Sequence, residues 1–121
     1  MPNVLVVDDD GDGLEIRKLI LERRGYAVTT AADAEQARAA FSSVSLGAFD
    51  AVILDVRLPL IEDGLALIRE FRTASPRVRI VVLCGNRGDL DRREEASMAD
   101  EILSKPARVE ALLNAIAGEF S

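Results

Sequence analysis

The sequence alternates between short apolar runs rich in β-branched residues and longer segments with helical periodicity. Because this alternation is typical of repeated strand–helix units around a parallel sheet, it predicts an α/β fold. The five predicted strands cover Val4–Val7, Ala27–Ala31, Ala51–Leu54, Arg79–Leu83 and Glu101–Leu103. Three of these runs are almost continuously apolar, which predicts a doubly wound sheet buried between two helix layers.

The first predicted helix follows the first strand. Ile16, Leu19 and Ile20 form its apolar stripe, and Arg17 is assigned to its polar face. Gly25 provides the C-terminal stop, because glycine readily adopts the left-handed conformation that ends many helices.

Three further helices have clear signals. Asp33 and Gln36 form a capping box at the start of the second helix. The third runs from about Leu65 and stops before Pro76. The predicted buried positions of the second, third and last helices are Ala37, Ala40, Phe41, Val44, Ile68, Phe71, Val109, Leu112, Leu113, Ile116 and Phe120.

A fourth helix is predicted over Leu90–Met98, where the apolar stripe is thin. Five consecutive charged residues, 91–95, occupy its centre. They are interpreted as a solvated helix face and not as a docking motif.

Composition narrows the classes of function. The 121 residues suit one domain, residues 1–121, without an internal repeat or linker. A net charge of −6 argues against non-specific binding to nucleic acid or anionic membranes, and no direct nucleic-acid contact is expected within this chain. No apolar run approaches the roughly 20 residues that span a bilayer, and no signal peptide is evident. These features predict a cytoplasmic protein.

The sequence contains no histidine and one cysteine, Cys84. The absence of histidine excludes a His-assisted triad, a His metal ligand and an imidazole pH switch within the chain. A single cysteine excludes an internal disulfide and a CxxC metal knuckle, which agrees with a reducing compartment.

Acidic residues follow the first and third predicted strands. Because the carboxyl ends of parallel strands meet at one edge of the sheet, Asp8, Asp9 and Asp10 are expected beside Asp55, with Lys105 nearby. Carboxylates this close repel one another, and one lysine cannot neutralise them, whereas a hard divalent cation can. The spacing therefore predicts a Mg²⁺ site.

Such a site supplies half of what phosphoryl transfer needs. An aspartate at a strand end can attack phosphorus to form an acyl phosphate, while a metal ion and an ammonium group stabilise the charge on the phosphoryl oxygens. Asp55 suits the role of nucleophile, and Lys105 suits that of the ammonium group.

Three stretches resemble the signature stretches of response-regulator receiver domains, in order and at normal spacing over essentially the whole chain. They are Val-Leu-Val-Val-Asp8-Asp9-Asp10, Ala51-Val-Ile-Leu-Asp55-Val-Arg-Leu-Pro59 and Ile102-Leu-Ser-Lys105-Pro106. Each stretch alone is weak evidence, whereas all three, each after its own strand, are highly specific.

The resemblance implies a flavodoxin-like three-layer sandwich with strand order 2-1-3-4-5, and a role in bacterial two-component phosphorelay. It implies phosphorylation of Asp55 by a partner histidine kinase or phosphotransfer protein, with Lys105 paired to the phosphoryl group. It also implies Mg²⁺ held by Asp9, Asp55 and the backbone carbonyl of Arg57, with Asp8 contributing through water.

Two positions depart from the family pattern at its conformational switch. Cys84 stands where the family has Ser or Thr, and a thiol is a poor hydrogen-bond donor to a phosphoryl group. Ile102 replaces the aromatic residue that the family moves inward on activation. The familiar Ser/Thr–aromatic pair is therefore absent.

The loop after Asp55 also departs from the pattern. It is one residue longer between Pro59 and Gly64 than is usual. Arg57 is placed to cover an acyl phosphate or to compete with the metal, which leads to the hypothesis of slow phosphate loss. An equal dephosphorylation half-life in an Arg57→Ala variant would contradict it.

Structural readings compete with these roles. Asp10 can act as a helix N-cap alone, and Asp55 can simply end a strand. Lys105 before Pro106 can belong to an ordinary solvated turn. Cys84 fits the role of a small buried hydrophobic residue better than that of a reactive thiol.

Two functions from different classes remain. The first is a phosphoacceptor receiver, at most self-phosphorylating and self-dephosphorylating and not an ordinary enzyme. The alternative is a pseudo-receiver, a phosphorylation-independent protein-interaction module, which Cys84 and Ile102 favour. Binding of beryllofluoride with Mg²⁺ separates the two.

Two other phosphate-binding classes conflict with particular residues. A flavin site needs a Ser/Thr/Gly-rich loop where the chain has three aspartates after its first strand. A haloacid-type phosphatase expects a second aspartate where Arg57 stands.

The expected partners follow from the same features. Because the chain has no histidine, the phosphoryl donor must be another protein's histidine or a small acyl phosphate. The expected output is contact with a downstream protein through the fourth and fifth predicted helices and the strand that contains Ile102.

Overall fold

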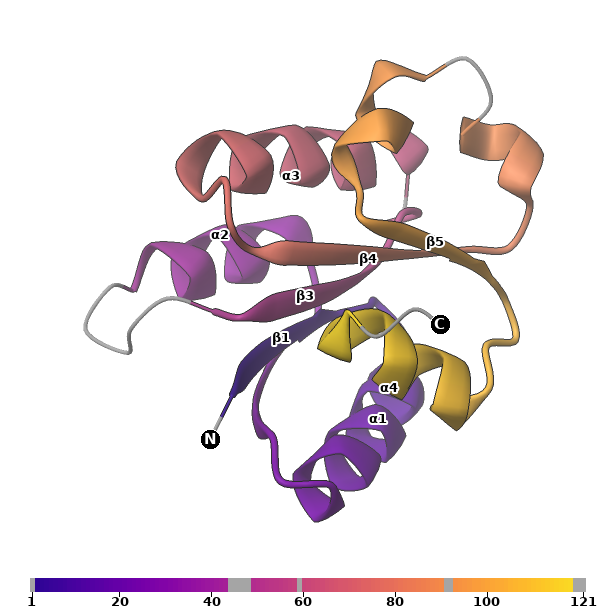
Figure 1. Cartoon of the computed structure of the whole chain (residues 1–121). Coiled ribbons are helices and arrows are strands. Elements are labelled where there is room, and N and C mark those ends of the chain that lie inside the picture. Colours follow the sequence, from indigo (N-terminus) through magenta and orange to yellow (C-terminus); the bar gives the residue numbers. More distant parts are fainter. Residues whose placement is uncertain (1, 44–48, 59, 91–92, 119–121) are drawn as a thin grey trace.

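The computed structural model describes residues 2–43, 49–58, 60–90 and 93–118, in which strands and helices alternate along the chain (Figure 1). The strands are β1 (Asn3–Val7), β2 (Ala27–Ala31), β3 (Ala51–Asp55), β4 (Arg79–Cys84) and β5 (Glu101–Ser104). The α-helices are α1 (Gly11–Arg23), α2 (Ala34–Ser42), α3 (Ile61–Ala74) and α4 (Val109–Ala117). Each predicted strand is confirmed, with at most one added residue at either end. No helix in these ranges is long and apolar enough to cross a membrane.

The five strands form one parallel sheet in the order β2-β1-β3-β4-β5, which confirms the predicted topology. The central position of β1 and β3 is fixed by their pairing, with Val4 beside Ala51 and Val7 beside Leu54. On its other side β3 pairs with β4, so that Asp55 lies opposite Leu83. The first and third strands therefore end side by side, and β4 ends next to them.

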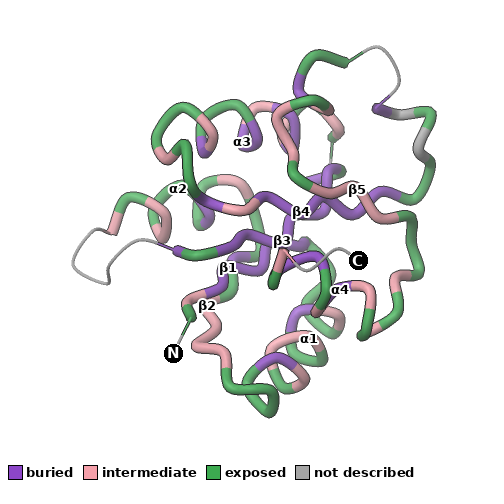
Figure 2. Tube along the Cα trace, in the orientation of Figure 1, coloured by how far each residue is buried: buried purple, intermediate pink, exposed green. Residues whose placement is uncertain are grey.

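Helices cover both faces of the sheet, as Figure 1 shows, with α2 and α3 on one face and α1 and α4 on the other. Alternate residues of β1 enter the two apolar layers, because side chains alternate across a strand. Leu5 and Val7 pack on the α2–α3 side, and Val4 and Val6 pack on the α1–α4 side. Figure 2 shows β1, β3 and β4 as buried, which agrees with their apolar sequences.

The predicted apolar face of α1 is wrong at two of its three residues, and only Ile20 is half-buried. Ile16 and Leu19 are 58% and 54% exposed, whereas Leu14 and Leu21 are buried. Arg17 lies three residues after Leu14 and four before Leu21, so the sheet-facing stripe contains an arginine in its middle. The reason is that its guanidinium has a buried anionic partner, which sequence periodicity does not reveal.

The predicted helix starts are confirmed in part. Asp33 Oδ1 accepts a hydrogen bond from the Gln36 N–H at 2.7 Å, and Gln36 Oε1 accepts one from the Ala32 N–H at 2.9 Å, as expected of a capping box. Helix α3 begins earlier than predicted, at Ile61. Val44 and Phe120, predicted for two buried helix faces, lie outside the described residues.

The helix predicted over Leu90–Met98 is also wrong. The described part of the β4–β5 connection contains two short 3-10 turns, η2 (Arg87–Leu90) and η3 (Glu94–Met98). Glu95 is buried and bonded to Arg69 of α3, so it is not part of a solvated face. A segment with so little apolar surface gains more from such pairs than from packing as a regular helix.

Candidate functional site

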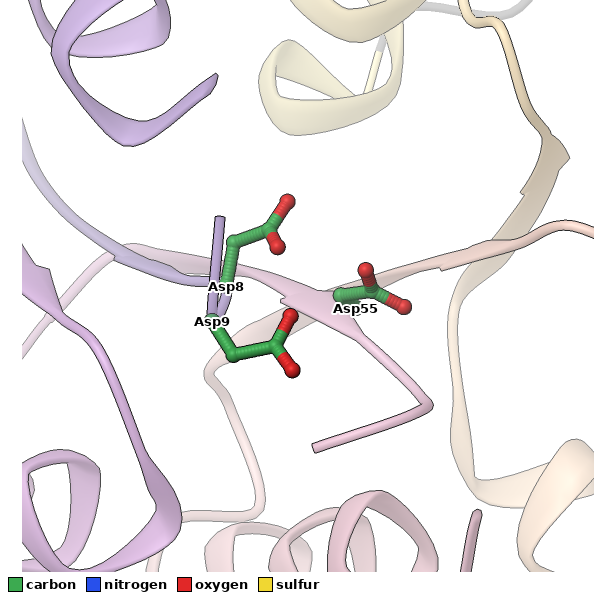
Figure 3. Close-up of side chains that lie close together, drawn as sticks. All are labelled: Asp8, Asp9 and Asp55. Atoms are coloured by element: carbon green, nitrogen blue, oxygen red, sulfur yellow. The ribbon is translucent and has the colours of Figure 1, made fainter. Parts of the chain in front are cut away.

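Three carboxylates meet where β1 and β3 end. Asp8 and Asp9 follow β1, and Asp55 is the last residue of β3. One oxygen of each lies within 4.8 Å of an oxygen of the other two, and Figure 3 shows the three side chains around one space. We call these three residues the acidic cluster. The structure thus brings together three of the four carboxylates that the strand-end argument predicted, and Asp10 is not part of the cluster.

Asp8 is almost fully buried, with 2% of its surface exposed, and both of its oxygens are used. Oδ1 accepts the N–H of Asp10 at 3.0 Å, and Oδ2 accepts Arg17 Nη1 at 2.5 Å. Burial raises the pKa of Asp8, but the hydrogen bonds from Arg17 and Asp10 and the charges of Arg17 and Lys105 outweigh it. The pKa of Asp8 therefore lies below its usual value, and this residue is ionised at neutral pH.

Asp55 has the same arrangement with different partners. Its Oδ1 accepts the Arg57 N–H at 3.1 Å, and its Oδ2 is bonded to the ammonium group of Lys105. Burial is the dominant effect here, and the charge of Asp8 adds to it, so the pKa of Asp55 lies above its usual value despite Lys105. A further cation beside Asp55 would therefore stabilise its ionised form.

Asp9 is exposed at the mouth of the acidic cluster. Among the described residues, none forms a hydrogen bond or ion pair with its carboxylate. A divalent cation fits this donor set, because all three ligand groups are carboxylates and one of them faces solvent. The cluster can therefore hold a metal ion.

Lys105 reaches Asp55 from the loop after β5. Its backbone N–H donates to the carbonyl of Cys84 at 2.9 Å, which fixes the start of the loop against the end of β4. The Lys105–Pro106 peptide bond is cis. The interpretation of Lys105 as part of an ordinary solvated turn is wrong, because its ammonium group is paired with a buried carboxylate.

Cys84 and Ile102 lie on the same face of the sheet, on the α2–α3 side. Cys84 is fully buried at the end of β4, next to Ser104 in the β4–β5 register. Ile102 is partly buried against the same apolar layer. These two residues therefore contact one layer of the core.

The loop after Asp55 is held by a contact that sequence reasoning missed. A Cβ at Gly64 would lie only 1.9 Å from the carbonyl oxygen of Val56, so only glycine allows this approach. The Val56 N–H donates to Leu83 O at 3.1 Å, which ties the loop to β4. Pro59 lies outside the described residues, and the side chain of Arg57 is exposed.

Arg17 is the other residue that sequence reasoning missed. The available signal was its spacing from Leu14 and Leu21, which places it on the buried face of α1. Asp10 occupies the N-cap position of α1, although its side chain makes no capping hydrogen bond.

The family model of the response regulator receiver domain matches residues 4–117. The chain is 38% identical over 117 residues to the transcriptional regulatory protein AruR of Pseudomonas aeruginosa. This alignment covers 94% of the chain and 47% of AruR, so the chain spans about half the length of that relative. The chain belongs to the response regulator receiver domain family.

Solved structures agree with this assignment. A receiver domain protein from Clostridium thermocellum superposes with a TM-score of 0.86 at 31% identity, covering 98% of this chain and 93% of that one. The response regulator TrrA from Thermotoga maritima, in complex with Mg²⁺ and BeF, gives 0.82 at 29% identity and 98% coverage of both chains. TrrA in complex with the histidine kinase ThkA gives 0.82 at 30% identity, covering all of both chains.

Proposed function

We propose that this chain is a phosphoacceptor receiver that takes a phosphoryl group onto Asp55 and signals to a downstream protein through contacts. The observation that carries the proposal is the acidic cluster, closed on one side by the bond from Lys105 to Asp55. A buried carboxylate beside two others and one ammonium group is the arrangement that acyl-phosphate formation requires.

The donor is a phosphohistidine of a histidine kinase or phosphotransfer protein, or a small acyl phosphate. The structure of TrrA with ThkA supports a kinase partner by analogy. An oxygen of Asp55 forms a bond to phosphorus while the bond from phosphorus to the donor breaks, and the donor leaves with that electron pair. Lys105 then moves from the carboxylate oxygen to the phosphoryl oxygens, whose charge it stabilises.

A divalent cation, proposed as Mg²⁺, would be held by Asp9, Asp55 and the backbone carbonyl of Arg57, with Asp8 acting through water. When bound, it supplies positive charge to the phosphoryl oxygens. Burial of Asp55 excludes water from one side of the reacting carboxylate, and the N–H of Arg57 keeps its orientation.

Treatment with acetyl phosphate and Mg²⁺ tests the proposal. We expect one phosphoryl group on the wild type, detected by Phos-tag electrophoresis and mass spectrometry, and none on Asp55→Asn. Asp12→Asn, which removes an exposed carboxylate of α1, is the matched control and should react like the wild type. Equal modification of Asp55→Asn would overturn the assignment of Asp55.

A pseudo-receiver is the second candidate, and the buried thiol of Cys84 beside the partly buried Ile102 favours it. Beryllofluoride with Mg²⁺ distinguishes the two functions. Absence of binding, measured by calorimetry, would leave the interaction module as the function. Binding without amide shifts in β5 and η3 would indicate an acceptor that lacks the usual switch.

A further inference from the structure

Arg17 reaches the acidic cluster from the sheet-facing side of α1. Its side chain is 20% exposed, and Nη1 lies 2.5 Å from Asp8 Oδ2. Asp8 has no other side-chain partner among the described residues. An ion pair at this distance is a charge-assisted hydrogen bond, and it holds the Asp8 carboxylate in place.

The local backbone leaves room for this approach. A Cβ at Gly13 would lie 3.8 Å from Arg17 Nη1, an ordinary contact distance, so the guanidinium lies beside the first turn of α1 without a clash. The Arg17 side chain also lines a small groove between α1 and α4, with Ile20 and Val109 among its apolar neighbours. Arg17 therefore borders this groove, and its guanidinium is bonded to Asp8.

A bound divalent cation would give the site an excess of positive charge. The three carboxylates are balanced by Lys105 and one divalent cation, which leaves the charge of Arg17 in excess. Two cations close together in a mostly buried site repel each other strongly, because screening there is weak.

We propose that Arg17 is a displaceable counter-cation of the acidic cluster, which holds Asp8 in the metal-free protein and competes with the divalent cation for it. Arg17 is thus a positioning residue for Asp8. This inference rests on the metal site of the proposed function. Metal binding then releases the guanidinium from Asp8, at a residue that lines the groove between α1 and α4.

Metal affinity tests the proposal directly. Mn²⁺ suits carboxylate and water ligands, and its free concentration can be measured by electron paramagnetic resonance. Arg17→Met keeps a straight side chain without charge, and Arg23→Met removes an exposed charge from the same helix as a control. We expect Arg17→Met to bind Mn²⁺ about tenfold more tightly, within the usual range of coupling between two sites, and Arg23→Met to bind like the wild type.

Stability provides a readout that separates competition from a purely structural role. Without metal, Arg17→Met should melt below the wild type, because it leaves a buried carboxylate without a cation. Saturating Mg²⁺ should remove most of this difference in melting temperature. The role of Arg17 would be overturned if Mg²⁺ left the difference in melting temperature unchanged and if Arg17→Met bound Mn²⁺ within twofold of the wild type. Absence of Mn²⁺ binding in every protein would overturn the metal site itself, and the inference with it.

A measurement on the wild type covers the case in which Arg17→Met does not fold. The guanidinium resonances of Arg17 can be followed by nitrogen-15 NMR during a Mg²⁺ titration, with those of Arg23 as the internal control. We expect the Arg17 resonances to shift with the same midpoint as metal binding. Unchanged Arg17 resonances at saturating Mg²⁺ would contradict displacement.

Discussion

The carboxyl edge of the sheet has two halves that are stabilised in different ways. In the charged half, at the ends of β1 and β3, Asp8 and Asp55 each bind a backbone N–H and a cationic side chain. In the β4–β5 half, Cys84 and Ile102 pack into the apolar layer, and η3 is bonded to α3 through Arg69. Buried carboxylates with cationic partners occupy one half, whereas apolar packing and the Arg69–Glu95 ion pair occupy the other.

The two halves differ in the step that they would serve, which is phosphoryl binding in the charged half and the conformational response in the β4–β5 half. The charged half retains the residue types that acyl-phosphate chemistry requires. The β4–β5 half has the thiol of Cys84 at the end of β4, where the resemblance predicts a hydroxyl group, so a phosphoryl group on Asp55 would find a weak donor there. The comparison predicts large effects for substitutions in the charged half and small ones for substitutions in the β4–β5 half.

The largest effect is expected for Gly64→Ala, which acts on the loop of the charged half. The added methyl group would collide with the Val56 carbonyl, and backbone there cannot move without displacing the loop after Asp55. We expect a loss of at least about 3 kcal/mol in the free energy of unfolding, measured by urea denaturation. Gly11→Ala is the control, because a Cβ there meets no atom within 4 Å. A similar stability for both variants would contradict the close approach.

Lys105→Met is expected to slow phosphorylation of Asp55 by acetyl phosphate about 100-fold, because one preorganised charge on the transferring group is lost. Initial rates from Phos-tag gels provide the measurement. Lys18→Met removes the other lysine of the chain, which lies on α1, and should leave the rate unchanged. A rate for Lys105→Met within a few-fold of the wild type would remove Lys105 from the reaction.

The two buried carboxylates should respond to pH with opposite signs when metal is removed with EDTA. Because the pKa of Asp55 is raised, its protonated form favours folding, and that stabilisation is lost as the pH rises through the raised pKa. Asp55→Asn should therefore be more stable than the wild type at neutral pH. Thermal melts should show this difference disappearing as the pH falls below the raised pKa.

Asp8→Asn provides the opposite case. Because the pKa of Asp8 is lowered, its carboxylate contributes stability above the pKa of the unfolded chain, and this is lost as the pH falls through the lowered pKa. Asp8→Asn should therefore be less stable than the wild type at neutral pH. If both variants changed stability in the same direction at neutral pH, the opposite pKa shifts of the two carboxylates would be contradicted.

The smallest effect is expected in the β4–β5 half. Cys84→Ser adds a hydroxyl donor at the end of β4, and it should raise the affinity for beryllofluoride with Mg²⁺ about threefold, as expected of one added hydrogen bond. Calorimetry measures the affinity, and amide shifts at Ile102 report whether β5 responds. Cys84→Ala is the matched control, and an equal gain with alanine would exclude a hydrogen bond as the cause.

The fold and the charged half could be predicted from the sequence for the same reason. Strand identity depends on local apolar runs, and parallel strands bring Asp8 and Asp55 together whatever the details of the helices. The face of α1 could not be predicted in this way. Periodicity assigns arginine to solvent, but Arg17 is half-buried on the sheet-facing side of α1, because Asp8, nine residues earlier, neutralises it.

The β4–β5 connection shows a second limit of sequence reasoning. The prediction of a solvated helix assumes that the charged residues of this segment are hydrated. Glu95 instead pairs with Arg69, 26 residues earlier, and Arg72 of α3 donates to the carbonyl of Met98 at 3.0 Å. Such distant pairings leave no local periodic signal, so the expected output surface on a fourth helix has no counterpart among the described residues of this segment.

The paired hydrogen bonds of Asp8 and Asp55 have a further consequence for conformational entropy. Each carboxylate keeps one oxygen on the N–H two residues later, which restricts rotation about its side-chain bonds. We therefore expect the rotamer to stay the same when the cation at the other oxygen is replaced. The free-energy difference between one occupant and the next then depends on charge and hydration alone, with little reordering of the acids themselves.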